Sequence, residues 1–246
     1  MIEFEHRGGG KTSCSKGFRG FTLAEVLITL GIIGVVAAMT LPMLMANHRK
    51  QVTETRLAKF YSVINQAIKM AEVDYEDKKV WGDIGSGFEL DENEQPTTNS
   101  IPLAWVNKYI MPYLNGAESY ALDTGHAVIK FSDGSLAILS KSSVIFYPDA
   151  KNFKSDLADK EGSGIVFFNF LMKPNSNTAQ NALHYDKGVE PYAFSAASLN
   201  PDDISVLKND ENYGCKEELP RNGRAYCTRL IQLNGWKIPK DYPLKF

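Results

Sequence analysis

Residues 21–77 read FTLAEVLITLGIIGVVAAMTLPMLMANHRKQVTETRLAKFYSVINQAIKMAEVDYED. No charged residue occurs between Val26 and Asn47. A helix of this length would rise about 33 Å, which is enough to cross the ~30 Å hydrocarbon core of a bilayer. The pattern therefore predicts a transmembrane helix over about residues 26–46.

The helical pattern continues beyond this apolar segment. Apolar residues recur at steps of three or four, with polar residues mostly between them, at Leu57, Phe60, Ile64, Ile68 and Ala71. Such spacing forms one apolar stripe on an amphipathic helix. We therefore expect a single helix over residues 21–77, which ends before Gly82 and Gly85. Pro42 should kink this helix, because proline removes one backbone hydrogen bond and clashes with the preceding turn.

The rest of the chain mixes short apolar runs with turn residues. Residues 127–131 and 136–139 flank Ser132-Asp133-Gly134, which is a good hairpin signal. Further elements are expected as strands at residues 144–147, 165–171 and 225–233, a short helix at 103–114, and loops at 89–100, 175–186 and 200–212. Together these elements predict an α+β fold in which the long N-terminal helix packs on an antiparallel sheet.

Composition excludes some function classes. Of the 246 residues, 43% are apolar and 23% are charged, and the net charge is −2. Residues 1–20 are glycine-rich and basic, so the remainder is more acidic than the whole chain. This balance disfavours a general nucleic-acid binder, and no nucleic-acid partner is predicted.

Glu25 stands at the mouth of the apolar run, five residues after Gly20. An acid is costly in lipid and does not help an ordinary signal peptide, so its position suggests a function. One alternative is a secretory signal peptide with a cleavage site near Val36-Ala37-Ala38, and another is a plain single-pass anchor. The length of the apolar run and the amphipathic stripe after it favour a segment that is kept.

The start of the apolar helix also resembles a known processing motif. Gly20-Phe21-Thr22-Leu23-Ala24-Glu25-Val26-Leu27, after a basic leader, resembles the cleavage and methylation motif of type IV prepilins and type II secretion pseudopilins. The resemblance spans residues 16–46 and continues through Gly31, Gly34 and Pro42. It implies that residues 1–20 are a leader, that a prepilin peptidase cuts after Gly20, and that the same enzyme methylates the Phe21 amine. It also implies assembly with other pilin or pseudopilin subunits through residues 21–77.

Side-chain chemistry agrees with these implied roles. Gly20 leaves the scissile bond unshielded by a side chain. After the cut, Phe21 would begin the chain with a cationic amine, and Glu25 of a neighbouring subunit could lie near that amine. Each charge alone is costly in an apolar bundle, whereas the pair is acceptable, so Glu25 would specify subunit alignment more than it adds stability. The alternative for Glu25 is a residue at headgroup level that reaches water.

Cysteine usage indicates an oxidising compartment. Cleavage after Gly20 would remove Cys14 and leave Cys215 and Cys227. An even pair in an exported domain indicates a disulfide, with two unrelated buried thiols as the alternative. Residues 226–239 are similar to the ends of some large prepilin-type proteins, and this second resemblance implies a disulfide-closed C-terminal loop.

No catalytic or cofactor motif stands out. His126 and His184 lack a recognisable nucleophile motif nearby, so both are expected to be ordinary surface or core residues. Residues 91–94 have Pro96 and Pro102 where a calcium loop needs glycine and glutamate, so a solvated acidic loop is expected there. We expect no cofactor, no metal and no enzymatic activity.

Lysine and arginine are equally numerous in residues 1–20 and 46–65, so charge does not orient the chain. The cut site and the cysteine pair instead place residues 78–246 outside the cytoplasm. The expected location is the bacterial inner membrane, as a single-pass protein, and then a surface or periplasmic filament.

Three functions are compatible with the sequence. The leading one is a structural subunit, a minor pilin or pseudopilin, of a type IV pilus-like or type II secretion filament. The size of the chain favours a minor subunit, because major subunits of the family are usually smaller. The others are an adhesin-like binding module that recognises a ligand with residues 82–246, and a membrane-tethered enzyme.

The cut site leads to the first prediction. Mass spectrometry of the mature protein should find a chain that starts at methylated Phe21. A mature chain that starts near Met39 would instead identify an ordinary signal peptide and contradict the prepilin interpretation.

Overall fold

The computed structural model describes residues 20–154, 162–194, 200–220 and 223–246. The chain divides into two compact units, one up to Met45 and the other from Ala46 to Phe246. Each unit is described by itself, and the second is called the head.

One long helix, α1 (Leu23–Tyr75), contains 53 residues and belongs to both units. The helix predicted at residues 21–77 is confirmed to within two residues at each end. It ends because Glu76 takes a φ of 64°, a left-handed conformation that an α-helix cannot continue through. Pro42 lies inside α1, and the expected kink there stays a prediction.

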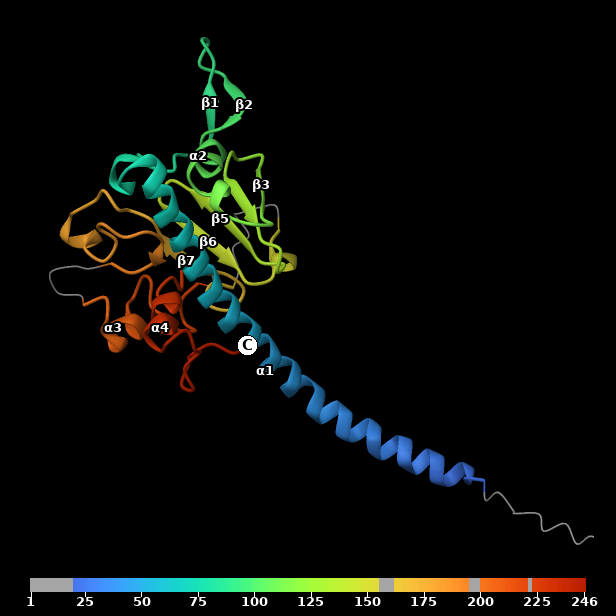
Figure 1. Cartoon of the computed structure of the whole chain (residues 1–246). Coiled ribbons are helices and arrows are strands. Elements are labelled where there is room, and N and C mark those ends of the chain that lie inside the picture. The colour runs from blue at the N-terminus through green and yellow to red at the C-terminus, as the bar shows by residue number, and fades with distance from the viewer. Residues whose placement is uncertain (1–19, 155–161, 195–199, 221–222) are drawn as a thin grey trace, which may run out of the picture. The chain divides into compact units, whose positions relative to one another are not determined.

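In the described part of the chain, six strands form one antiparallel sheet of the head, in the order β3-β4-β5-β6-β7-β8 (Figure 1). They are β3 (Glu118–Ala121), β4 (Ala127–Lys130), β5 (Leu136–Ser140), β6 (Ser143–Tyr147), β7 (Phe168–Leu171) and β8 (Glu190–Pro191). The hairpin predicted around residues 132–134 joins β4 to β5, and Gly134 turns it with a φ of 81°. Strands that are adjacent in this sheet are also consecutive in the sequence, so the sheet needs no crossover connection.

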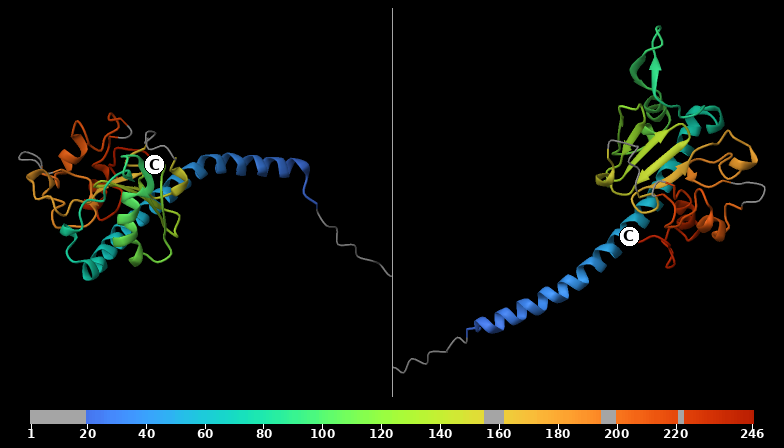
Figure 2. Two further views of the ribbon diagram at one scale, coloured as in Figure 1. Left: turned by 90° about the horizontal axis from the view of Figure 1, so that it is seen from above. Right: turned by 180° about the vertical axis from the view of Figure 1, so that it is seen from behind.

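The amphipathic part of α1 covers one face of this sheet, which Figure 1 shows from the helix side and the right panel of Figure 2 from behind. The five stripe residues predicted from the sequence are each at most 3% exposed. Phe60 stacks on Phe146 with ring centroids 4.3 Å apart, and it meets Phe170 edge-on at 5.2 Å. Burial of a side chain of this size contributes about 1.5–3 kcal/mol. The α+β, pilin-like architecture is thereby confirmed.

The opposite face of the sheet carries a second apolar cluster. Its members alternate along the strands with those that face α1, as the period of two requires, and are Val128, Leu136, Ile138, Ile145, Tyr147 and Phe167. The sheet is therefore a buried layer with apolar side chains on both faces.

Short helices complete the described chain. They are η1 (Lys78–Val80), α2 (Ile101–Tyr109), η2 (Met111–Tyr113), η3 (Ala150–Asn152), η5 (Ala179–Asn181), α3 (Ile204–Asn209) and α4 (Cys227–Leu233). The helix expected at residues 103–114 corresponds to α2 and η2. It starts at Ile101 because the hydroxyl of Ser100 accepts the Leu103 N–H at 3.0 Å and caps the helix.

The prediction of a loop at residues 89–100 was wrong. This segment forms a β-hairpin from β1 (Phe88–Leu90) and β2 (Pro96–Ser100). The Asp91 carboxylate accepts the N–H groups of Asn93 at 2.8 Å and Gln95 at 2.9 Å, and so closes the turn. Polar composition therefore hid a hairpin that side-chain-to-backbone hydrogen bonds specify.

The strand expected at residues 225–233 was also wrong, because this segment forms helix α4. Its aromatic and β-branched residues favour strands. However, Cys227, Leu230 and Ile231 are spaced like one face of a helix, and each is at most 3% exposed. Tertiary burial therefore overrides local propensity.

The loop expected at residues 200–212 contains the one-and-a-half-turn helix α3. The Asp203 carboxylate accepts the N–H groups of Ser205 at 2.8 Å and Val206 at 3.4 Å, while Leu207 is fully buried. An Asp one residue before an apolar residue was a capping signal that the sequence reading missed.

Polar side chains of α1 bind the backbone of the head. Both ends of the Arg56 guanidinium donate to carbonyl oxygens, those of Asp133 and Pro148. The Asn65 amide bonds the backbone of Val189 in both directions, with both distances 2.9 Å. These contacts fix the rotation of α1 against the sheet more sharply than apolar packing alone.

Glu54 joins α1 to the C-terminal tail. It is only 7% exposed, and its carboxylate accepts the Ile238 N–H at 2.9 Å and the Lys237 ammonium at 3.1 Å. The Ile238 side chain is itself buried. Loss of the carboxylate would leave this N–H without its acceptor in a buried place.

We therefore expect Glu54→Ala to lower the free energy of unfolding by about 2 kcal/mol or more, because a buried donor loses its partner. Urea unfolding of the full chain in detergent, followed by tryptophan fluorescence, measures this. Glu118→Ala is the matched control, since its pair with Lys130 is 3.9 Å long and exposed. An equal change in both variants would contradict the anchoring role of Glu54.

Candidate functional site

The candidate site is the start of α1. Gly20, Phe21 and Thr22 precede the helix, and Phe21 is 87% exposed. A Cβ added to Gly20 would meet no atom within 4 Å. The peptide bond between Gly20 and Phe21 therefore lies on exposed backbone outside any helix or strand, where a protease can reach it.

Thr22 and Glu25 cap the helix reciprocally. The Thr22 N–H and hydroxyl both donate to Glu25 Oε2, at 2.8 and 2.7 Å, and the Glu25 N–H donates to the Thr22 hydroxyl at 3.2 Å. This is a capping box, in which two otherwise unpaired backbone donors are satisfied. The carboxylate also lies at the positive end of the helix dipole.

The capping box leaves part of Glu25 available. Among the described residues, its hydrogen bonds all use Oε2 and Oε1 makes none. The sequence reading identified Glu25 but missed Thr22 as its partner. The signal was the spacing Thr-x-x-Glu immediately before the apolar run.

The helix after Glu25 presents apolar side chains on all sides. Its most apolar stretch has a mean hydropathy of 2.3 and none of it is buried in the structure. Leu27, Ile28 and Ile33 are 61%, 63% and 62% exposed. One helix of the described chain is thus long and apolar enough to cross a membrane, and a surface of this kind needs lipid or other helices around it.

Polar groups in this segment are satisfied within the helix. The Thr29 hydroxyl donates to the Glu25 carbonyl at 2.9 Å, and the Thr40 hydroxyl donates to the Val36 carbonyl at 2.9 Å. Neither hydroxyl therefore requires water. Cβ atoms added at Gly31 and Gly34 would meet no neighbour within 4 Å, so both positions offer room for close approach.

The two cysteines of the described chain form a disulfide. Cys215 and Cys227 are bonded with an S–S distance of 2.05 Å, and both are fully buried. The bond links the segment that follows α3 to the first residue of α4. Closure of a loop with a sequence separation of 12 contributes roughly 2–3 kcal/mol in the chain-entropy model. The expected disulfide is present, and the alternative of two free thiols is not.

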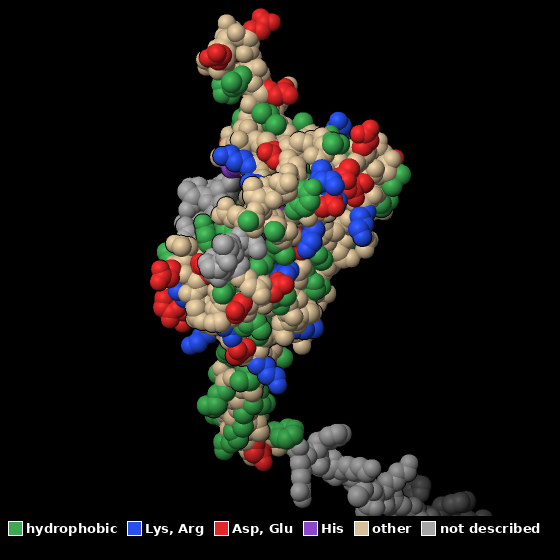
Figure 3. All heavy atoms as spheres, turned by 90° about the vertical axis from the view of Figure 1, so that its left-hand side faces the viewer, with side chains coloured by type: hydrophobic (Ala, Val, Ile, Leu, Met, Phe, Trp, Pro, Cys, Tyr) green, Lys and Arg blue, Asp and Glu red, His purple; other side chains and the backbone are tan. Residues whose placement is uncertain are grey.

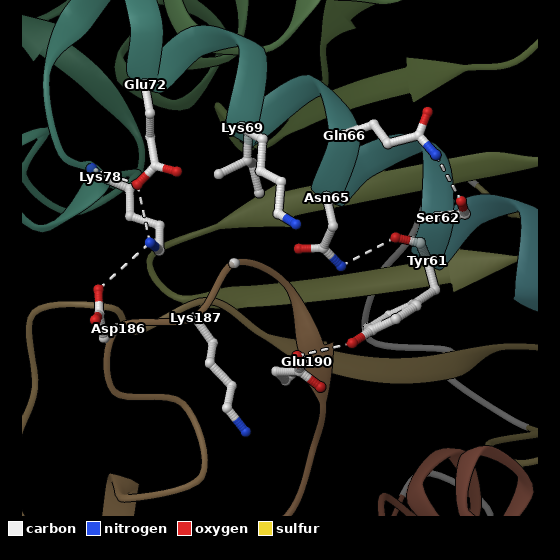
Figure 4. Close-up of a pocket in the computed structure, with 12 residues that line it drawn as sticks. Tyr61, Ser62, Asn65, Gln66, Lys69, Glu72, Lys78, Asp186, Lys187 and Glu190 are labelled. Carbon is white, nitrogen blue, oxygen red and sulfur yellow. Dashed lines mark hydrogen bonds and ion pairs between the residues drawn. The ribbon is translucent and has the colours of Figure 1, made fainter.

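A groove on the head offers another place to search for chemistry. It has a volume of about 450 Å³ and lies between α1 and the segment that leads into β8 (Figure 4). Lys78 bonds Glu72 at 2.9 Å and Asp186 at 3.4 Å. Tyr61 donates to Glu190 at 2.8 Å, and its pKa is raised to about 12 by burial and by the Glu190 charge.

This groove has no arrangement suited to catalysis. Lys78 pairs with Glu72 and Asp186, Glu190 accepts from Tyr61, and Figure 4 shows no nucleophile directed at a base among the residues drawn. Among the described residues, no group of three His, Cys, Asp or Glu side chains could hold a metal ion.

The two candidate histidines have different settings. His126 Nδ1 lies 2.6 Å from the Thr124 hydroxyl near the surface. His184 is fully buried, and its Nε2 donates to the Ala193 carbonyl at 2.9 Å. Burial lowers the pKa of His184 to about 4, with smaller contributions from the charges of Lys187 and Arg229. His184 is therefore a neutral core residue at pH 7.

Comparison with known families gives two matches. Residues 15–41 match the prokaryotic N-terminal methylation motif. Residues 43–246 match a family described as a family of unknown function, DUF6613. No curated protein and no solved structure matches the chain. The first match identifies a prepilin-type N-terminal cleavage and methylation protein, which is pilin-like or pseudopilin-like and belongs to a structural rather than a catalytic class.

His184 leads to a prediction of pH dependence. Because its pKa is lower in the folded state, the unfolded chain binds a proton first as pH falls below the usual histidine pKa of about 6.5. Stability should therefore fall between about pH 6.5 and pH 4, by about 3 kcal/mol, and this contribution should level off below pH 4.

Urea unfolding of the full chain at several pH values measures this slope. His184→Gln is the comparison, since it keeps an N–H donor and cannot be protonated in this range. Ion pairs with Lys79 and Lys208 hold the pKa values of Asp186 and Asp241 below their usual range, so these carboxyls titrate at lower pH. Identical slopes for the parent and the variant would contradict the assignment.

Proposed function

The chain belongs to the family of unknown function DUF6613, and from this premise we propose that it is a structural subunit of a type IV pilus-like or type II secretion filament. Its large head favours a minor pilin or pseudopilin. Prepilin peptidase cuts after Gly20 and methylates Phe21. Residues 1–20 are then the removed leader, residues 21–77 the assembly helix and residues 78–246 the extracytoplasmic domain.

One observation carries this proposal: the exposed apolar part of α1 begins with a capped acid, five residues after an accessible glycine. The apolar surface requires lipid before assembly and other subunits' helices afterwards. A plain anchor has no use for Glu25 at the edge of that surface.

The geometry of Glu25 supports a role in alignment. Thr22 holds Oε2 while Oε1 makes no hydrogen bond among the described residues, so the Phe21 amine of a neighbour can approach without breaking the cap. A charge-assisted hydrogen bond of this kind is about twice as strong as a neutral one. Registers that leave either charge unpaired in an apolar bundle lose several kcal/mol by the general cost of a buried ion.

The disulfide supports an extracytoplasmic head. Disulfides persist in oxidising compartments such as the periplasm and are rare in the cytoplasm. The topology that follows is a single pass through the inner membrane, with the cleaved N-terminus on the cytoplasmic side.

Glu25→Ala tests the assembly role. We expect the variant to insert in the membrane. The fraction of the protein that is associated with filaments should fall at least tenfold, because the Phe21 amine of the neighbouring subunit loses its partner. The measurement compares the protein in sheared, sedimented filaments with that left in the membrane. Thr29→Val is the control. The Thr29 hydroxyl donates only to carbonyls of its own helix, so this variant should assemble normally.

The same fractionation separates this function from an adhesin-like module that uses the helix only as an anchor. A filament subunit sediments with the filaments, whereas an anchored module stays dispersed in the membrane. Unaltered assembly of Glu25→Ala would rule out the pairing role.

A further inference from the structure

The β1–β2 hairpin projects from the head. Figure 1 shows it at the end of the head where α1 finishes, beyond the edge of the six-stranded sheet. Its base is fixed, because the Ser100 hydroxyl donates to the Gly125 carbonyl at 2.7 Å and the Ile101 N–H donates to the Gly87 carbonyl at 3.1 Å. The hairpin is therefore held in place at its base and free along its length.

Neither face of this hairpin is covered. Leu90 is 61% exposed, and every residue from 89 to 96 is exposed. A two-stranded hairpin without a core is marginally stable in water. An apolar residue on such a projection gains stability when another surface covers it. The hairpin therefore has the properties of a docking element.

The hairpin also carries uncompensated negative charge. Residues 88–100 contain Glu89, Asp91, Glu92 and Glu94 and no lysine or arginine. None of these four carboxylates has an ion-pair partner among the described residues. Asp91 is occupied with its turn, whereas Glu92 and Glu94 are exposed at the tip.

The opposite end of the head carries unpaired positive charge. We call this set the basic base, and it consists of Arg49, Lys50, Lys240 and Lys245. The C-terminal tail reaches α1 there through the contacts of Lys237 and Ile238 with Glu54. Within the described chain, no residue of the basic base makes an ion pair. Figure 3 shows acidic side chains on the hairpin, and lysine and arginine side chains among those at the far end of the head.

The tip of the hairpin cannot reach the basic base of its own chain. From Lys50 to Tyr75 the helix advances 25 residues, a rise of about 38 Å, and the hairpin lies at the same end of the head as the C-terminal end of α1 (Figure 1). The two surfaces are complementary in charge, and each lacks a partner within the head. A second copy of the chain supplies both.

We propose that the acidic β1–β2 hairpin of one subunit docks on the basic base of the next copy of this chain. The contact joins two different patches, so it is heterologous, and a heterologous contact that does not close into a ring continues as an open filament. Leu90 becomes covered in the contact, while the charges select the partner and its orientation. This inference rests on the proposed function. It adds a contact between the heads of neighbouring subunits to the contact between their helices.

Cross-linking in membranes and filaments of cells that assemble the full chain tests the proposal. Asn93→Cys and Gln51→Cys place one thiol in the hairpin turn and one beside the basic base without altering any charge. A short bis-maleimide should join copies into dimers and longer ladders. Cys215 and Cys227 do not react, because they are bonded to each other.

Charge reversal makes the test specific. In this background, Glu92→Lys with Glu94→Lys, or Lys240→Glu with Lys245→Glu, should reduce the cross-linked fraction at least about fivefold, because like charges then face each other. The combination of all four changes should restore it. The control is Glu118→Lys, an exposed acid of β3 that belongs to neither surface, which should leave the cross-linked fraction unchanged.

Two results would overturn the inference: no loss on hairpin reversal, or no recovery in the four-fold variant. Loss on reversal of the base alone would assign the basic base to lipid headgroups or another protein. Processing at Phe21 and sedimentation with filaments, measured in the same samples, report the proposed function separately. Filaments without the cross-link contradict only the inference, whereas a chain that is not processed at Phe21 contradicts both.

Discussion

The contact between the apolar stripe of α1 and one face of the sheet is the interaction on which the head depends. A stripe with a period of 3.6 residues meets strand faces with a period of two, and Phe60 lies where they converge, between Phe146 and Phe170. Apolar side chains from both partners form one continuous cluster. Without α1, this face of the sheet would be open to water, so the helix is part of the domain core and not an appendage of it.

Polar contacts convert this apolar packing into a defined orientation. Arg56 and Asn65 bond backbone groups of the sheet connections, while Glu54 bonds the backbone of the C-terminal tail. Backbone partners do not depend on the identity of the side chain at those positions. The same helix continues without interruption into the apolar segment. A displacement of α1 along its axis would therefore break many contacts at once, and this makes the helix suited to carry load between the head and the proposed filament.

The sequence predicts the parts of the structure that strong periodicity specifies. The long helix, the hairpin around Gly134 and strands β4 to β6 follow from apolar spacing and turn residues. The errors occur where short segments depend on other contacts. The β1–β2 hairpin is polar and specified by the Asp91 turn, and α4 is built from strand-favouring residues that a disulfide and burial hold in a helix. Propensity over seven residues is too weak to outweigh such contacts.

The candidate site, too, could be predicted from the sequence only in part. The motif around Gly20 and Glu25 can be recognised from spacing alone, whereas the partnership of Thr22 with Glu25 becomes visible only once hydrogen bonds are drawn. That partnership explains how one acid can serve two environments. A cap is worth about 0.5–2 kcal/mol, and a buried unpaired charge costs several times more. In the proposed filament, a neighbour's amine that approaches Oε1 leaves the cap on Oε2 intact. The aligned register therefore keeps both interactions, any other register keeps at most one, and a single carboxylate at the third position of the helix is enough to distinguish them.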